Sequence, residues 1–362
     1  MLEGQGEQSL KSDSSYDSEN LCHLLEVSKA LNSILDLDCL LEVVMDKVME
    51  ITRAERGFLM LHAPEEGLVF RVVKNLDKEL VEGENFRISR SIAEEVFQRG
   101  IPVCSTNVLH DERVKHRKSV MELGLESVMC VPLLLKKKIL GVIYVDSHRV
   151  SSVFTKSHLN VLTALAEHAA IAIENARLYE MAITDEKTGI FNHSFFRRKL
   201  EEKWTQAVEG DYAFALMLID LDHFKDINDK YGHKNGDEVL RGIAFILKGS
   251  VRGNDIPARF GGEEFAVILS SDSHKALGAN ASPALLKRSA RSLAERLRKA
   301  VESRTFRCDE HEIKITISIG VAFFPSPDIR KPEDLFVQAD MCLYRAKKEG
   351  RNRVCYTNSL EM

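Results

Sequence analysis

The run ARFGGEEFAV at positions 258–267 holds two glycines and two carboxylates on one tight turn between strand-forming residues. Gly261 and Gly262 can take backbone angles that a side chain would forbid, which would let a phosphate come close to bare main chain. Glu263 and Glu264 place negative charge where a hard cation could bridge protein and phosphate. By itself, such a run is more often an ordinary hairpin turn with solvated acids, so its meaning depends on other segments.

A second group of polar residues follows an apolar segment upstream of this turn. The segment Phe214–Ile219 predicts a buried strand. Asp220 and Asp222 then lie at or just past its carboxyl end, where open sheets of α/β domains bind ligands. We therefore expect Asp220 to be able to share a cation with Glu263.

A helix is expected to follow this strand after a polar loop. Asp237 is placed to open that helix directly after Gly236, since aspartate is a favoured N-cap residue. The apolar positions behind it recur at helical spacing: Val239, Leu240, Ile243 and Leu247. A capping role alone would be enough to explain Asp237.

Five separated blocks, in order, carry a resemblance to a known family: DEKTGIFNH at 185–193, IDLDHFKDIND at 219–229, RFGGEEF at 259–265, ISIGVA at 317–322 and ADMCLYRAKKEGRNRV at 339–354. Residues 183–358 thereby resemble a GGDEF domain, the diguanylate cyclase family that condenses two GTP into cyclic di-GMP. The first block departs from the family pattern, because Lys187 stands where the family usually has a leucine.

The resemblance implies a site for Mg²⁺ or Mn²⁺. Asp220, the main-chain carbonyl of Leu221 and Glu263 match the metal ligands of the family, a hard oxygen set that suits either ion. Glu264 matches a residue that joins a second ion or helps to deprotonate the attacking hydroxyl. Phosphoryl transfer of this kind rests on positioning and charge neutralisation, in which Lys225 is expected to take part with the two glutamates.

The resemblance also implies which residues bind GTP. Main-chain amides around His223 and Phe224, together with Lys225 and the glycines Gly261 and Gly262, are expected to receive phosphates. Lys347 and Arg351 match further phosphate ligands near the end of a helix that is expected to stop at Gly350. Without the family match, these two cations would be ordinary favourable charges at a helix terminus.

Asn228 and Asp237 match the residues that recognise guanine in the family. A carboxylate accepts from two neighbouring N–H groups of guanine that adenine does not offer. Members that make mixed cyclic GMP-AMP tend to carry serine at this position. The aspartate therefore favours cyclic di-GMP over the mixed cyclic dinucleotide, which remains an alternative product.

An R-x-x-D arrangement, Arg252 and Asp255, is separated from Gly261 by five residues. Its offset matches the family's inhibitory product site, where the arginine would bind phosphate or guanine and the aspartate would accept from guanine. Taken alone, the pair would more often be an exposed ion pair. The resemblance thus predicts inhibition by cyclic di-GMP.

Composition limits the remaining possibilities. A chain of 362 residues has room for two domains, and a net charge of −5 gives no general attraction for nucleic acid or a membrane surface. The seven cysteines form no C-x-x-C pair, which favours reduced thiols and a cytoplasmic location. The longest apolar runs are shorter than the roughly 18 residues that span a bilayer, and no signal peptide begins the chain.

The amino-terminal half predicts a second domain. Residues 1–19 are polar and expected to be disordered. Residues 20–160 resemble a GAF sensory domain in their order of elements: two helical stretches within 21–51, strands at 57–63 and 68–76, a helix from Ser91 to a stop at Gly100, and a hairpin at 127–147 that turns at Lys136, Lys137 and Lys138. Such a domain implies an unknown small ligand, for which a cyclic nucleotide is one possibility.

The expected fold class is therefore α/β (α+β) with two domains. A GAF-like antiparallel sheet with helices comes first, and a linking helix leads to a GGDEF mixed sheet flanked by helices, in residues 185–358. Within the linking segment 161–184, apolar residues follow a 3,4 spacing: Leu162, Leu165, Ala169, Ala172, Ala176, Tyr179 and Ile183. This seam predicts a parallel two-stranded coil that leaves the first domain past Glu174, although packing on the GAF sheet would explain its first members equally well.

Three functional hypotheses follow. The first is a diguanylate cyclase that works as a homodimer, because each protomer supplies half of a site for two GTP molecules. The second is a receptor that binds cyclic di-GMP through Arg252 and Asp255 without catalysis. The third makes the amino-terminal domain, as a ligand-binding scaffold, the principal functional part. Because Asp220, Glu263 and Glu264 are all present, the sequence favours the enzyme.

Overall fold

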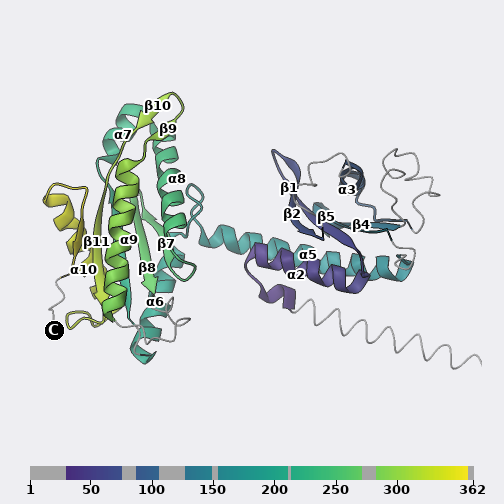
Figure 1. Cartoon of the computed structure of the whole chain (residues 1–362), viewed down its shortest axis with the longest axis horizontal. Coiled ribbons are helices and arrows are strands. Elements are labelled where there is room, and N and C mark those ends of the chain that lie inside the picture. Colours follow the sequence, from purple (N-terminus) through teal and green to yellow (C-terminus); the bar gives the residue numbers. More distant parts are fainter. Residues whose placement is uncertain are drawn as a thin grey trace, which may run out of the picture. The chain divides into compact units, whose positions relative to one another are not determined.

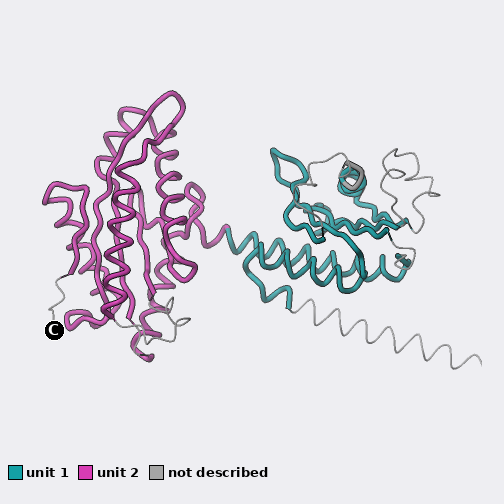
Figure 2. Tube along the Cα trace, in the orientation of Figure 1, with its two compact units in different colours: residues 1–180 teal, residues 181–362 magenta. Residues whose placement is uncertain are grey.

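The computed structural model describes residues 30–75, 87–105, 127–148, 154–210, 213–270 and 283–357. The chain forms two compact units, residues 1–180 and 181–362 (Figure 2). Both units combine helices with a sheet, which confirms the expected fold class. The segment 1–19 lies outside the described residues. Among the helices within these ranges, none combines the length and the apolar composition that crossing a bilayer requires.

The sheet of unit 1 has five antiparallel strands (Figure 1). Their order is β2 (Gly67–Lys74), β1 (Arg56–Ala63), β5 (Lys138–Ser147), β4 (Ser127–Leu135) and β3 (Val103–Ser105). β1 and β2 are the two strands expected at 57–63 and 68–76. The hairpin expected at 127–147 is β4 and β5, and its turn contains Lys136 in the left-handed region, with φ 56°.

Alternating residues of β1 supply the two faces of this sheet. Leu59 and Leu61 pack with α2 (Leu37–Thr52) and α5 (Lys156–Ile183), whereas Phe58 and Met60 pack with α3 (Arg87–Arg99) on the opposite face. The expectation that Ser91 caps its helix is wrong, because α3 begins four residues earlier at Arg87. Gly100 does end α3, with φ 68° and its N–H donating to the Val96 carbonyl.

Most of α5 belongs to the core of unit 1. The residues of the expected seam up to Ala176 are buried against the sheet of unit 1 and α2: Leu162, Leu165, Ala169, Ala172 and Ala176. This corrects the expectation that the helix leaves the domain past Glu174. The exposed apolar side chains of α5 are on another face: Ile171, Leu178 and Met181 are 43%, 52% and 66% exposed. The boundary expected at residue 160 also falls inside this helix.

The sheet of unit 2 is centred on β6 (Phe214–Leu221), which pairs antiparallel with β11 (Ile317–Phe324) and β8 (Glu264–Ser270). β7 (Ile256–Gly261) and β12 (Val354–Tyr356) form the edges, and β12 runs parallel to β11. Every residue of β6 is buried, because helices cover both faces. This burial explains why the strand reads as one continuous apolar run.

Two helical layers enclose this sheet (Figure 1). Ala215, Met217 and Ile219 of β6 share a core with α8 (His233–Ser250) and α9 (Pro283–Ser303). The alternate residues pack with α6 (His193–Gly210) and α10 (Pro332–Lys348). The remaining elements are α7 (Phe224–Tyr231) and the hairpin of β9 (Phe306–Cys308) and β10 (His311–Ile313).

Close packing of α10 on β11 fixes the position of the end of α10. A Cβ on Gly320 of β11 would lie 2.2 Å from the Ala339 carbonyl oxygen and 2.3 Å from the Leu343 nitrogen, so only glycine allows this approach. Lys347 follows one turn after Leu343 on the same helix. The carboxyl end of β6, the β7–β8 hairpin and the end of α10 thus bring their polar residues together.

Candidate active site

Carboxylates from two neighbouring strands meet at the carboxyl end of β6. Asp220 of β6 is directly opposite Glu264 of β8 in the antiparallel register. The N–H of Leu221 lies 3.4 Å from the carbonyl of Glu263, which is in the turn between β7 and β8. Opposed residues of an antiparallel pair share one face of the sheet, so Asp220 and Glu264 project to the same side.

Asp220 is 7% exposed, and its carboxylate Oδ2 lies 2.7 Å from Nζ of Lys347. Burial has the largest effect on the Asp220 pKa and raises it, while the ion pair with Lys347 opposes the rise. The negative charges of Glu263 and Glu264 raise it further, and the pKa remains above its ordinary value. A negative cluster of this kind attracts cations.

The donor set fits a hard divalent ion. The Lys347 ammonium already occupies a cation position on Asp220. Within the described ranges, no three side chains of His, Cys, Asp or Glu form a metal-binding cluster. The chain would therefore supply the Asp220 and Glu263 carboxylates and the Leu221 carbonyl, and substrate phosphates and water would supply the rest. Mg²⁺ is commonly held by one or two carboxylates in this way.

The two glycines of the hairpin act differently from the expectation. Gly261 pairs with Glu264, and Gly262 and Glu263 form the two-residue turn between β7 and β8. Neither glycine has its φ in the left-handed region, so the expectation of backbone angles forbidden to other residues is wrong. A Cβ on Gly262 would meet nothing within 4 Å, which leaves the main chain open to a ligand.

Arg259 holds this hairpin and was not singled out by sequence reasoning. Its guanidinium donates to the Gly262 carbonyl at 2.8 and 3.1 Å and to the Asp185 carboxylate at 3.1 and 3.3 Å, and its side chain is only 13% exposed. Burial raises the pKa of Asp185, but hydrogen bonds from Thr188 and Arg259 outweigh this effect and leave that pKa below its ordinary value. The arginine thereby joins the hairpin to the first turn of unit 2.

The turn from β6 to α7 has the form of an anion site. His223 is in the left-handed region, with φ 59°, and α7 starts at Phe224, so the first amides of the helix have no partner within it. Lys225 is exposed in the first turn of α7. These residues lie next to the carboxylate cluster along the chain.

Asp222 fixes this turn, a role that the sequence did not indicate. Its side chain is 4% exposed and accepts hydrogen bonds from the hydroxyls of Thr316 and Ser318, both at 2.7 Å. It also accepts from the Asn352 amide at 3.1 Å. Asp222 thus ties the end of β6 to β11 and to the loop that follows α10.

Arg351 lies in that loop. α10 ends at Lys348, Gly350 has φ 115°, and Arg351 itself is left-handed with φ 62°, while its N–H donates to the Ala346 carbonyl. The expected end of the helix near Gly350 is confirmed. Lys347 lies on the last turn of α10, and its ammonium is on Asp220, although the sequence predicted phosphate contacts.

The expected base-recognition residues lie on α7 and α8. Asn228 packs tightly on α8, because a Cβ on Gly236 would lie 2.0 Å from the Asn228 Oδ1. Asp237 does not open a helix as expected, because α8 begins at His233 after Gly232. Asp237 instead sits inside α8 and pairs with Lys187, whose Nζ is 2.8 Å from its Oδ1.

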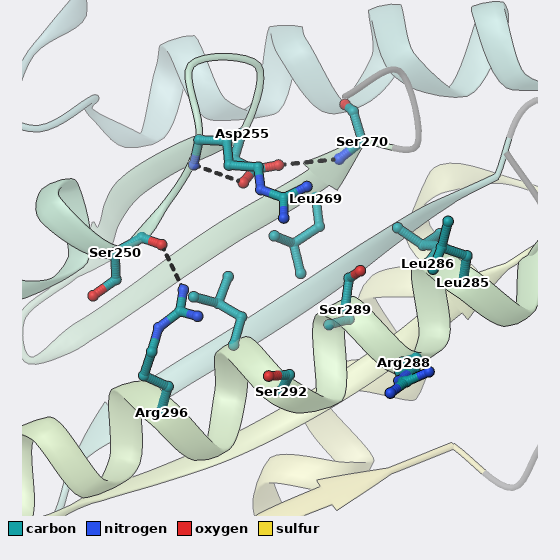
Figure 3. A pocket seen from close by; sticks show the side chains of 13 residues that line it. Ser250, Asp255, Leu269, Ser270, Leu285, Leu286, Arg288, Ser289, Ser292 and Arg296 are labelled. Atoms are coloured by element: carbon teal, nitrogen blue, oxygen red, sulfur yellow. Dashed lines mark hydrogen bonds between the residues drawn. The ribbon is translucent and has the colours of Figure 1, made fainter. Parts of the chain in front are cut away.

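A separate cavity of about 250 Å³ contains the R-x-x-D pair (Figure 3). Asp255 is buried and accepts from the Arg252 amide at 2.9 Å and the Ser270 amide at 3.4 Å. Arg288 and Arg296 of α9 line the same cavity. Sequence reasoning missed both arginines, although their spacing of eight places them on one face of a helix.

Comparisons with known proteins find a matching family for each half of the chain. A family model described as "Diguanylate cyclase, GGDEF domain" matches residues 182–353, and one described as "GAF domain" matches residues 35–174. Diguanylate cyclase A of Treponema denticola is 32% identical over 360 residues, which cover 92% of this chain and 88% of that protein.

Other similar proteins match a smaller share of the chain. Response regulator PleD of Caulobacter vibrioides is 38% identical over 177 residues, or 48% of this chain and 36% of that protein. Among solved structures, the coiled coil and GGDEF domain of DgcB from Caulobacter crescentus, in complex with c-di-GMP, is 28% identical with a TM-score of 0.45. That match covers 56% of this chain and 98% of the other.

Proposed function

The chain belongs to the family of GGDEF-domain diguanylate cyclases, and on this basis we propose that it joins two GTP molecules into cyclic di-GMP and releases two pyrophosphates. The observation that carries the proposal is the acidic cluster of Asp220, Glu263 and Glu264. Within this cluster the carboxylate of Asp220 is buried and pairs with the ammonium of Lys347. Carboxylates in such an arrangement are what a metal-assisted phosphoryl transfer requires.

In each step, the 3′ hydroxyl oxygen of one GTP attacks the α-phosphorus of the other. A new P–O bond forms, the bond to the β-phosphate oxygen breaks with its electron pair, and pyrophosphate leaves. Glu264 accepts the hydroxyl proton, directly or through water. Asp220, Glu263 and the Leu221 carbonyl would hold Mg²⁺ or Mn²⁺, which when bound supplies neutralisation of phosphate charge.

Cations of the chain bind the terminal phosphates. Lys225 and the main-chain amides of His223 and Phe224 lie at the N-terminus of α7, which favours anions. Lys347 is free to turn toward phosphate once another cation occupies its position on Asp220. Arg351 adds charge from the loop that Asp222 fastens through the Asn352 amide.

Asn228 and Asp237 select guanine. The carboxylate of Asp237, whose side chain is 27% exposed, accepts from N1–H and N2–H of the base, and adenine offers neither donor. This favours GTP over ATP and cyclic di-GMP over a mixed product.

The reaction needs two copies of unit 2, one for each GTP, so the working form is a homodimer. The exposed apolar face of α5, defined as Ile171, Leu178 and Met181, supports this proposal. These residues recur at spacings of seven and three, as in a coiled-coil seam. A second copy of α5 would cover these three residues. They would form the dimer seam in place of the residues expected from the sequence, which are mostly buried within unit 1.

Two forms of regulation complete the proposal. Cyclic di-GMP would inhibit by binding in the cavity of Arg252 and Asp255, whose arginine-rich lining suits an anionic ligand. Unit 1 would respond to a small ligand, with a cyclic nucleotide as one candidate, and change the activity of unit 2.

The decisive experiment incubates the full chain with GTP and Mg²⁺ and identifies the product by mass spectrometry. Asp220→Asn and Glu263→Gln should each lower cyclic di-GMP formation about 100-fold or more. Asp309→Asn should leave cyclic di-GMP formation unchanged. Asp309 is an exposed acid in the β9–β10 turn and pairs with Lys234 of α8. Binding of cyclic di-GMP without turnover of GTP would instead favour the receptor hypothesis, and a mixed dinucleotide from GTP and ATP would contradict the role given to Asp237.

A further inference from the structure

Lys187 and Asp237 form an ion pair across fifty positions of sequence. The Lys187 Nζ lies 2.8 Å from Oδ1 and 2.9 Å from Oδ2 of Asp237, so one ammonium bridges both carboxylate oxygens. The lysine side chain is 53% exposed and that of the aspartate 27%. Lys187 is also the position at which the first sequence block departs from its family, and the functions assigned above leave it without a role.

We propose that Lys187 is a specificity-determining residue that donates a hydrogen bond to O6 of the guanine base, an inference that rests on the proposed function. Guanine presents one acceptor, O6, beside two donors, N1–H and N2–H. Asp237 supplies two acceptors but no donor. The ammonium on Asp237 supplies the missing donor, so the pair together offers the acceptor, acceptor and donor pattern with which cytosine recognises guanine.

The bound base requires a small movement of the lysine. In the structure the Lys187 ammonium lies in front of the Asp237 carboxylate, where N1–H and N2–H would bind. An ammonium has three donors, and each carboxylate oxygen has a second lone pair on its outer side. Lys187 therefore keeps its contact with the outer lone pair of one oxygen while it turns another N–H toward O6. Its flexible and half-exposed stem permits this shift.

The same ammonium penalises adenine. Adenine carries an amino group in place of O6, so two donors would face each other at this point. It also lacks both N–H groups that Asp237 accepts. Lys187 thus adds to the preference of Asp237 for guanine over adenine. It acts on binding of the base and does not contact the reacting phosphates.

The experiment compares two nucleotides on the full-length protein. One is 3′-deoxy-GTP, which binds but has no hydroxyl for attack, and the other is its 6-thio analogue, in which weakly accepting sulfur replaces O6. Calorimetry in the presence of Mg²⁺ gives the dissociation constants. The unsubstituted protein should bind 3′-deoxy-GTP about five- to tenfold more tightly than the 6-thio analogue, the size expected for one charge-assisted hydrogen bond in a partly exposed site.

Lys187→Met keeps the length of the side chain but removes the donor. It should weaken binding of 3′-deoxy-GTP about five- to tenfold and bind the 6-thio analogue almost equally well, with kcat for GTP little changed. Lys187→Arg, which keeps a donor, should retain part of the discrimination. Lys234→Met removes another exposed lysine ion pair of unit 2 and should change neither constant. If the methionine variant does not fold, Lys187→Gln serves in its place.

Tighter binding of 3′-deoxy-GTP by Lys187→Met would overturn the inference and make the lysine a competitor of the base. If the ratio of the two dissociation constants is the same in Lys187→Met as in the parent, the ion pair of Lys187 and Asp237 is only a structural contact. Either result, in a protein that still makes cyclic di-GMP, leaves the proposed function intact. A protein that neither binds nor converts GTP would refute both.

Discussion

The ammonium of Lys347 lies 2.7 Å from the buried carboxylate of Asp220, so a residue expected to bind phosphate neutralises a residue expected to bind metal. The two roles are compatible, because a divalent ion at Asp220 would repel the ammonium toward the phosphates that enter with it. Lys347 thereby limits the electrostatic cost of the acidic cluster.

Metal binding should be sensitive to pH because of Asp220. Burial and the neighbouring glutamates raise its pKa, so on acidification it takes up a proton at a higher pH than an ordinary aspartate, whose pKa is about 3.9. Mn²⁺ titrations followed by calorimetry should show affinity falling as the pH is lowered toward the raised pKa. Affinity that stays constant down to the pKa of an ordinary aspartate would contradict this account.

Asp220→Asn should separate stability from activity. A group whose pKa is raised in the folded state favours folding below its unfolded pKa, and that contribution is lost as the pH rises through the folded value. At neutral pH the ionised Asp220 is therefore a net burden, and its replacement should leave the melting temperature unchanged or higher. Activity should fall about 100-fold or more. A variant that melts well below the parent would refute the electrostatic argument.

Gly236→Ala should impair binding of the base. The new Cβ would lie 2.0 Å from Asn228 Oδ1 and 3.2 Å from the Phe224 ring, which forces Asn228 away from α8. We expect a raised KM for GTP with a smaller effect on kcat. Gly249→Ala is the matched control on the same helix, since its Cβ would meet nothing within 4 Å and should stabilise the helix by about 0.5–1 kcal/mol.

Arg259→Ala should loosen the β7–β8 hairpin. The change removes donors to Gly262 and Asp185 from a largely buried site, which should cost about 1–3 kcal/mol of unfolding free energy and lower kcat. Chemical denaturation and steady-state kinetics measure the two effects. Asp185→Asn should reproduce part of the loss, and a double variant no worse than Arg259→Ala alone would indicate that the two residues act together.

Product inhibition should depend on α9 as well as on the R-x-x-D pair. Arg296 lines the cavity of Asp255 and donates to the Ser250 carbonyl at 2.8 Å. Arg252→Ala and Arg296→Ala should each raise the concentration of cyclic di-GMP that halves activity, without lowering the uninhibited rate. Arg291→Ala is the control, because Arg291 lies over the Tyr356 ring and does not line the cavity. If cyclic di-GMP inhibits all three variants and the parent equally, this cavity is not the inhibitory site.

Disulfide trapping should locate the dimer seam. Leu178→Cys and Met181→Cys, on the exposed face of α5, should form cross-linked dimers under mild oxidation. Ala176→Cys, buried in the core of unit 1, should not. The reverse result would restore the seam expected from sequence spacing.

Sequence alone determined the two-domain class, the central strand β6 and the residues of the acidic cluster, because strand burial and tight turns depend on local residue types and spacing. It gave the wrong start for α3 and α8, since favourable cap residues at Ser91 and Asp237 also occur inside helices that begin earlier. Helical spacing likewise could not distinguish which face of α5 is buried, because an alanine-rich stripe suits a sheet and a second helix equally.

Only the tertiary structure decided the long-range pairs. Lys347 with Asp220, Arg259 with Asp185, and Lys187 with Asp237 join segments that lie between 50 and 127 positions apart, and local sequence carries no signal for such distant partners. The position of each pair follows from packing, as when Gly320 lets α10 come close to β11 and so carries Lys347 toward the end of β6. The sequence thus determined which charges are present, and the packing of helices on the sheet decided which of them meet.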